Sequence, residues 1–254
     1  MDSPQTEEPA PGLNLNFSTF KPPNENDKPE DFFEVKLAEG GDKTPRWIRK
    51  TDSRQFLVFI ATSVRTEHEG GGAAQQVGWA FMYRPGKYKK ENYKELMAQY
   101  LYYFGWLQAR VGNLGYTGEP AEQTGNRAAL RALYAALIFR SWEQEGASTL
   151  VIATNNPLLI RLGQCVEGWA GHEEMPTERA QNKDLWGLID ECMMGPPDGD
   201  GVKVQIWPIK HNMNVRTLHK ATNASHEVDI KTWADGLLRL QKLNHAKELA
   251  GAIQ

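Results

Sequence analysis

One helical segment set between strand-like segments limits the possible folds of this chain more than any other feature. Residues 124–145 repeat apolar side chains at helical spacing, and one face holds Leu130, Leu133, Tyr134, Leu137, Ile138 and Trp142. Thr124 can cap this helix and Gly146 can end it. Residues 150–154 follow as a short apolar run, which is typical of a buried strand. The helix is therefore predicted to cross over from one strand of a sheet to another.

Three more strands are predicted before this crossover. Residues 54–63 read RQFLVFIATS, which is apolar, β-branched and aromatic, and residues 77–84 form a second such run that ends at Pro85 and Gly86. A third strand is predicted near residues 104–111. Because the three strands follow one another in sequence, they predict an antiparallel meander.

The rest of the chain adds one strand and several helices. The apolar spacing predicts a strand over residues 202–209 and helices over residues 157–166, 182–194, 216–224 and 230–250. The predicted fold class is α/β, with a mixed five-stranded sheet of three antiparallel and two parallel strands, helices on both faces and an extra C-terminal helix. The predicted organisation is a disordered tail (1–46), a domain (47–225) with an insertion (87–103), and a helical extension (226–254).

The tail is predicted to be disordered because its composition is polar. Residues 1–46 are rich in Pro, Glu, Asp, Asn and Lys and cannot bury enough apolar surface to fold alone. A few apolar residues interrupt this composition: Leu13, Leu15, Phe17, Phe20, Phe32 and Phe33. Either the tail lays a few of these side chains on the domain, which we favour, or it is a short partner-binding segment.

Composition and charge exclude some classes of function. Hydrophobic residues make up 40% of the chain and charged residues 24%, as in an ordinary soluble globular protein. The formal net charge is −3, whereas a dedicated nucleic-acid-binding protein usually carries a basic excess. Residues 1–12 are polar and acidic, unlike a signal peptide, and no apolar run is long enough to span a bilayer. We therefore expect an intracellular protein, nuclear or cytoplasmic, without membrane contact.

The order of these segments, together with several short strings, resembles type-1 ribonuclease H, and most of all its fungal members. The strings QTGNRAALRAL and LVIATNN are the most specific, and RQFLVFIATS, GWAFMYRPG, NKDLWGLID and VQIWPIKHNMN accompany them. The resemblance covers residues 54–224. It implies a ribonuclease H-like fold, and hydrolysis of the RNA strand of an RNA–DNA hybrid by two Mg²⁺ ions that four carboxylates hold.

The four family positions that carry these carboxylates hold other residues in this chain. They match Ala61, Ala129, Asn155 and Leu218, the last of them to within one residue. Two divalent cations a few Å apart repel each other unless several negative charges hold them, which alanine, asparagine and leucine cannot supply. The sequence therefore predicts a pseudoenzyme: a ribonuclease H-like chain with no metal, no cofactor and no nuclease activity.

Two alternatives to a natural pseudoenzyme stay open. Acids elsewhere could hold a relocated metal site, and Glu67 and Glu69, on a predicted loop, and Glu122 are the nearest candidates. Asp52 is not one of them, because it lies nine residues, or about 30 Å of extended strand, before the first of the four positions. The alanines could also be deliberate inactivating substitutions. However, the surroundings differ as well, with Thr62 in place of the family's glycine, so we favour natural loss.

Part of the family's substrate surface is matched. In the family a Thr and an Asn hold a DNA phosphate and an Asn pair contacts the minor groove; the matching residues are Thr124, Asn182 and Asn126, with Gly125 replacing half of the pair. Thr and Asn are also good helix N-caps, so either role explains Thr124 and Asn182. A basic group could contact phosphate or form a solvated rim: Lys210, His211, Arg216, His219 and Lys220. At most, weak nucleic-acid binding is expected.

Two segments outside the resemblance are candidates for binding a protein partner, because aromatic side chains dominate protein interfaces. The first segment holds the aromatic residues Tyr102, Tyr103, Phe104 and Trp106. The second is the predicted C-terminal helix, in which Trp233, Leu237, Leu240 and Leu243 lie on one side. Burial on the domain is the alternative for both segments. The sequence thus predicts a protein-interaction module or adaptor in a nucleic-acid-processing assembly. The alternatives are a non-cleaving binder of RNA or RNA–DNA hybrid, and a metal-dependent nuclease with relocated ligands.

Overall fold

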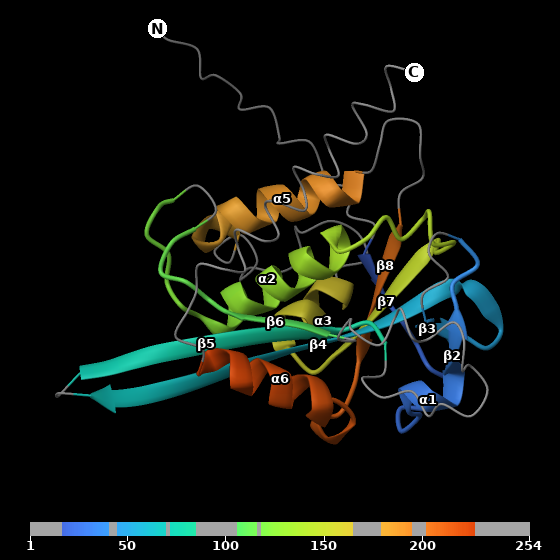
Figure 1. Cartoon of the computed structure of the whole chain (residues 1–254), viewed down its shortest axis with the longest axis horizontal. Coiled ribbons are helices and arrows are strands. Elements are labelled where there is room, and N and C mark those ends of the chain that lie inside the picture. Colours follow the sequence, from blue (N-terminus) through green and yellow to red (C-terminus); the bar gives the residue numbers. More distant parts are fainter. Residues whose placement is uncertain are drawn as a thin grey trace, which may run out of the picture.

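A computed structural model describes residues 17–40, 45–69, 72–84, 106–115, 118–164, 179–194 and 202–226. The molecule is a mixed α/β protein built around one long strand, β4 (Asp52–Glu69), with helices on both faces of the sheet (Figure 1). The predicted insertion at residues 87–103 and the helical extension after residue 226 lie outside the described residues, so both stay predictions.

The central strands have the predicted order and directions. β4 pairs antiparallel with β5 (Gly72–Met82), and β5 pairs antiparallel with β6 (Trp106–Arg110). On its other edge β4 runs parallel to β7 (Thr149–Thr154), which runs parallel to β8 (Lys203–Pro208). The order is thus β6–β5–β4–β7–β8, a meander followed by two crossovers. The fold is ribonuclease H-like.

Helices cover the two faces of this sheet unequally. α2 (Gly125–Ile138), α3 (Pro157–Gln164) and α5 (Lys183–Met194) lie on one face, and α6 (Val215–Ser225) lies on the other (Figure 1). Side chains alternate along β4, so Val58 and Ile60 join the large core under α2, whereas Leu57 and Phe59 join a second cluster on the opposite face. None of the helices in the described part is long and apolar enough to cross a membrane.

The N-terminal segment is folded, which corrects the predicted disordered tail. β1 (Phe17–Thr19) runs parallel to β8 at one edge of the sheet, and β2 (Phe33–Leu37) and β3 (Pro45–Arg49) extend the sheet beside the first half of β4. Together with α1 (Pro29–Phe32) they form a strap, residues 17–40 and 45–49, and the sheet has eight strands within the described residues rather than the predicted five. The prediction of disorder over residues 1–46 is therefore wrong for residues 17–40, 45 and 46. Residues 1–16 lie outside the described part.

Three phenylalanines explain why such a polar segment folds. Phe17, Phe20 and Phe33 are all buried, as expected if the tail lays side chains on the domain. The ring centroids of Phe20 and Phe33 lie 4.8 and 6.1 Å from that of Trp207 on β8, within the usual range for aromatic pairs. The residues between these anchors are mostly exposed and polar, so the average composition of the segment hides the anchors.

A buried ion pair fixes the strap to the turn that follows α2. Arg46 donates from Nε and Nη2 to the two carboxylate oxygens of Glu145, at 2.8 and 2.7 Å. The guanidinium also lies over the rings of Tyr83 and Trp142. Burial lowers the pKa of Arg46, and the hydrogen bond and charge of Glu145 oppose that effect. The strap is therefore held by the core of the domain as well as by strand pairing.

Several element boundaries differ from their predictions. α2 ends at Ile138, because the chain turns back over its end, where Trp142 Nε1 donates to the carbonyl oxygen of Ala136 at 2.8 Å. Gly146 has the positive φ of +97° that a turn needs, and it ends that turn rather than the helix. β4 and β5 run past their predicted ends into a hairpin that projects beyond the helices (Figure 1), since polar residues there continue the pairing without an apolar pattern.

Candidate functional site at the carboxyl end of the parallel strands

The predicted site lies where β4 and β7 run side by side toward their carboxyl ends. Ile60 of β4 pairs with Thr154 of β7, so Ala61 and Asn155 are the next residues on two neighbouring strands. α6 starts at Val215 and packs across β4 and β5 at this point. In open α/β sheets this edge is where ligands bind.

Small apolar side chains surround Ala61. Ala61, Ala80 of β5 and Ala221 of α6 are buried and form one cluster, and Leu218 packs against it. α6 approaches β5 so closely that a Cβ atom on Gly78 would lie 2.1 Å from the carbonyl oxygen of Ala221. Ala61 and Leu218, two of the four family positions, thus lie in one apolar cluster and offer no side-chain oxygen to a ligand.

Asn155 belongs to a hydrogen-bond network built on side-chain amides. Asn214, the residue before α6, donates from Nδ2 to the carbonyl oxygen of Ile60 at 2.8 Å and to Oδ1 of Asn155 at 3.3 Å. Nδ2 of Asn155 lies 3.4 Å from Nδ1 of His211. Asn214 is only 2% exposed, and its Oδ1 atom has no hydrogen-bond partner within the described ranges. Asn214 was missed by the sequence reasoning, although an Asn just before a predicted helix is a common sign of a structural role.

The second amide of the Asn155–Asn156 pair has a structural role. Oδ1 of Asn156 accepts from the backbone N–H groups of Leu158 and Leu159, at 3.0 and 3.3 Å, and so caps α3. Its Nδ2 donates to Oγ1 of Thr62 on β4, at 3.3 Å. Asn156 therefore ties the first turn of α3 to β4, which leaves Asn155 as the residue that faces the site.

Ala129 occupies a different environment from the other three positions. It lies on α2, is fully buried and belongs to the main core cluster, not to the cluster of Ala61 and Leu218. The structure thus brings Ala61, Asn155 and Leu218 together around the start of α6 and places Ala129 within the core. A side chain larger than alanine at position 129 would have to displace packed apolar neighbours.

Two of the three acids considered for a relocated metal site lie on β4, beyond this edge. Glu67 lies on β4 rather than on the predicted loop, six residues or about 20 Å beyond Ala61. Its carboxylate accepts from Gln76 and pairs with Arg65 at 3.1 Å. Glu69 ends the same strand. Over the described ranges, no group of three or more His, Cys, Asp or Glu side chains is placed to hold a metal ion.

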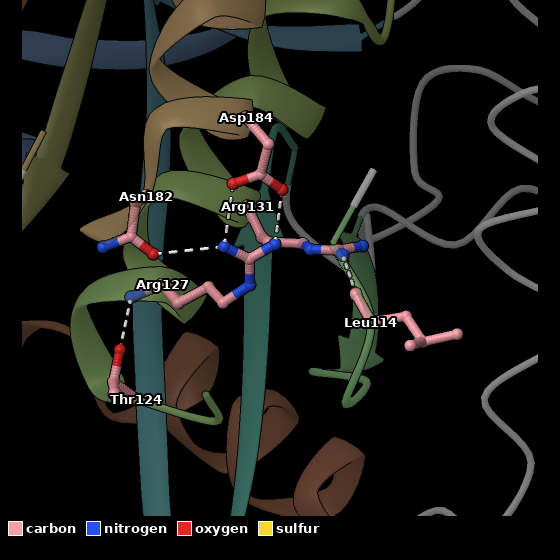
Figure 2. Close-up of polar contacts among 6 residues, drawn as sticks. All are labelled: Leu114, Thr124, Arg127, Arg131, Asn182 and Asp184. Carbon is pink, nitrogen blue, oxygen red and sulfur yellow. Dashed lines mark hydrogen bonds and ion pairs between the residues drawn. The ribbon is translucent and has the colours of Figure 1, made fainter. Parts of the chain in front are cut away.

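The residues matched to the family's phosphate site are engaged with the protein itself (Figure 2). Oγ1 of Thr124 accepts from the backbone N–H of Arg127 at 3.1 Å, which confirms the predicted N-cap. Oδ1 of Asn182 accepts from Nη1 of Arg127 at 3.2 Å, and Asp184 accepts two hydrogen bonds from the same guanidinium at 3.0 and 2.5 Å. Arg127 is 1% exposed, so this ion pair links α2 to α5 inside the protein. Asn126, beside it on α2, is partly exposed.

Only one of the predicted partner-binding residues lies within the described ranges. Trp106 starts β6, is partly buried, and has the ammonium group of Lys220 3.7 Å from its ring centroid. Tyr102, Tyr103, Phe104, Trp233 and Leu237 lie outside the described residues.

Comparisons with known proteins give low sequence identity throughout. No family model matches the chain, and no curated protein matches it. Among solved structures, the chain is similar to the foamy viral protease–reverse transcriptase in complex with double-stranded DNA, with 13% identity, a TM-score of 0.36, and coverage of 67% of this chain and 93% of that chain.

Two ribonuclease H structures are similar to about the same degree. The N-terminal ribonuclease H domain of Rv2228c from Mycobacterium tuberculosis is 12% identical, with a TM-score of 0.34 and coverage of 66% of this chain and 98% of that chain. LC9-RNase H1, a type 1 enzyme with the type 2 active-site motif, is 18% identical, with a TM-score of 0.31 and coverage of 66% and 72%. The assignment of the fold rests on the strand order and directions described above, not on these likenesses.

Proposed function

We propose that this chain is a ribonuclease H-like domain without nuclease chemistry, which serves as a protein-interaction module in a nucleic-acid-processing assembly. The observation that carries the proposal is the set of uncharged side chains at the three family positions that meet where the middle of β4 lies beside the carboxyl end of β7. Ala61 and Leu218 lie in an apolar cluster there, and Asn155 is bound to a second amide.

Electrostatics supports the loss of metal chemistry. A pair of Mg²⁺ ions needs anionic oxygen ligands, since the repulsion between two dications must be offset by nearby negative charge. Of the three positions that meet at this edge, Asn155 alone supplies a side-chain oxygen; that oxygen is uncharged and already accepts from Asn214. The residues at these positions therefore do not fit a pair of Mg²⁺ ions.

The segments outside the resemblance support an interaction role. The strap is not one of the proposed binding segments, because its Phe20 and Phe33 side chains are buried against Trp207 of β8. The segment around Tyr102 and Tyr103 and the stripe that begins at Trp233 carry the side-chain types that dominate binding energy at protein interfaces. A non-cleaving nucleic-acid binder remains the second candidate, and it is favoured by the basic surface of α6 described below.

The interaction role predicts a partner that survives nuclease treatment. We expect affinity capture of the full chain from its native extract to recover the same protein with and without nuclease. Tyr102→Ala with Tyr103→Ala, or Trp233→Ala with Leu237→Ala, should reduce that recovery at least tenfold, because aromatic anchors commonly contribute about 2 kcal/mol or more. Glu67→Gln, on the projecting hairpin, is the control and should leave recovery unchanged. Recovery that disappears with nuclease in every variant would contradict the adaptor role.

A further inference from the structure

A stretch of the chain without acidic residues surrounds α6. The whole chain has 32 Asp and Glu among 254 residues, yet none of them lies between residues 202 and 226. The same stretch holds four Lys or Arg residues and three of the chain's six histidines: Lys203, Lys210, Arg216, Lys220, His211, His219 and His226. The protein therefore carries a local positive region within a total charge of −3.

The fold gathers most of these charges on one exposed surface. Thr217, Ala221 and Ala224 of α6 are buried toward the sheet, so Arg216 and His219 face solvent. Lys210 lies exposed just before the helix, where its Nζ donates to Oδ1 of Asn26 at 2.5 Å.

Two of the cations have a regular spacing along the helix. Arg216 and Lys220 are four residues apart, which places them about 6 Å apart along the axis on one side of α6. This separation is comparable to that of neighbouring phosphates along a nucleic-acid strand. Neither of them, nor Lys210, has an ion pair with any acid of the described segments.

Trp106 lies at the edge of the basic surface and contacts one of its cations, Lys220. The Lys220 ammonium group lies 3.7 Å from the ring centroid, close enough for a cation–π contact. Because the cation covers this face of the ring, that face is closed to a stacked base and instead holds the cation at the surface. The arrangement thus suits contact with phosphate rather than recognition of bases.

We propose that the outer face of α6, with Lys210, Arg216 and Lys220, binds the phosphate backbone of nucleic acid without preference for base sequence. The exposed residues of α6 are polar apart from Val215, whereas an interface with an acidic protein would need an apolar centre. This inference goes beyond the proposed function, because it requires neither recognition of a hybrid nor the loss of nuclease chemistry.

Fluorescence anisotropy in EDTA tests this surface, with a labelled single-stranded RNA, the matching DNA strand and their hybrid as probes. The test variant removes the three cations: Lys210→Gln, Arg216→Gln and Lys220→Gln. The matched control removes three exposed lysines outside residues 202–226: Lys36→Gln, Lys50→Gln and Lys183→Gln. Circular dichroism with urea confirms that both variants are folded.

For the wild type we expect the logarithm of the association constant to fall with the logarithm of the salt concentration at a slope of about −2 to −3. Each phosphate contact contributes roughly −0.7 to −0.9 to this slope. The test variant should bind at least tenfold more weakly at low salt and show a slope near zero, whereas the control should stay within about twofold of the wild type. Equal loss in both variants, no loss in either, or equal competition by polyglutamate would overturn the proposal. EDTA prevents metal-dependent cleavage of the probes. The binding result therefore does not depend on whether the protein has lost nuclease activity, as the proposed function states.

Discussion

Deletion of residues 1–46 is expected to unfold the domain. The deletion removes Phe17, Phe20 and Phe33, all buried, and also Arg46 of the buried pair with Glu145. Loss of one buried phenylalanine side chain costs about 3–5 kcal/mol, and loss of one partner of a buried ion pair costs about the same. Together these losses, about 12–20 kcal/mol, match or exceed the roughly 5–15 kcal/mol stability of a typical domain. Circular dichroism and urea unfolding measure the effect.

A shorter deletion and a pair of point substitutions test whether the strap, rather than residues 1–16, stabilises the domain. Deletion of residues 1–16 leaves every described contact in place and should not shift the urea midpoint. Phe33→Ala should lower the free energy of unfolding by about 3–5 kcal/mol, whereas Lys36→Ala, on the same strand but exposed, should change it by less than about 0.5 kcal/mol. A protein lacking residues 1–46 that unfolds cooperatively at the wild-type midpoint would show that the strap is dispensable. Partner-binding experiments should therefore truncate no further than residue 16.

Restoring the missing acids at the two buried positions is expected to destabilise the protein strongly. Ala61 and Ala129 are 1% and 0% exposed and have apolar neighbours, so a carboxylate at either position loses its hydration without gaining a partner. We expect Ala61→Asp and Ala129→Glu to lower the free energy of unfolding by several kcal/mol each. Ala61→Asn and Ala129→Gln are the matched controls, since they have nearly the same volume and no charge.

The pH dependence of these variants distinguishes charge from volume. Burial raises the pKa of a carboxyl group above its unfolded value, so the folded state favours the protonated form. The charge penalty is therefore absent at pH values below the unfolded pKa, grows as the pH rises from the unfolded pKa to the folded pKa, and stays constant above the folded pKa. The deficit of Ala129→Glu relative to Ala129→Gln should shrink between pH 8 and pH 4. An equal deficit at both pH values would mean that volume alone causes it.

The strand order could be predicted from the sequence because the five central strands and the crossover helix carry strong apolar patterns. Leu150–Thr154 is buried on every residue, and α2 has the predicted face in the core. The strap could not be predicted in the same way, because its anchors are single phenylalanines separated by polar turns. Their partner, Trp207, lies far along the chain.

The site was only partly predictable. The resemblance implied that Ala61 and Asn155 belong to one site, and the parallel pairing of β4 with β7 brings them together. Asn214 could not be placed from sequence, because its two acceptors come from β4 and from the end of β7. The engagement of Asn182 by Arg127 likewise depends on how α2 and α5 pack, which local patterns do not specify.

A cleavage assay with a labelled RNA–DNA hybrid tests most directly whether the site lacks metal chemistry. The purified full chain is incubated with Mg²⁺ or Mn²⁺ beside two variants. Glu67→Gln removes one of the two acids that β4 carries beyond the site, and Asn155→Asp restores a single carboxylate. We predict no cleavage above the metal-free background for all three proteins, because one carboxylate cannot hold two dications. Metal-dependent cleavage by the wild type that Glu67→Gln abolishes would contradict the account and would show that relocated ligands hold the metal.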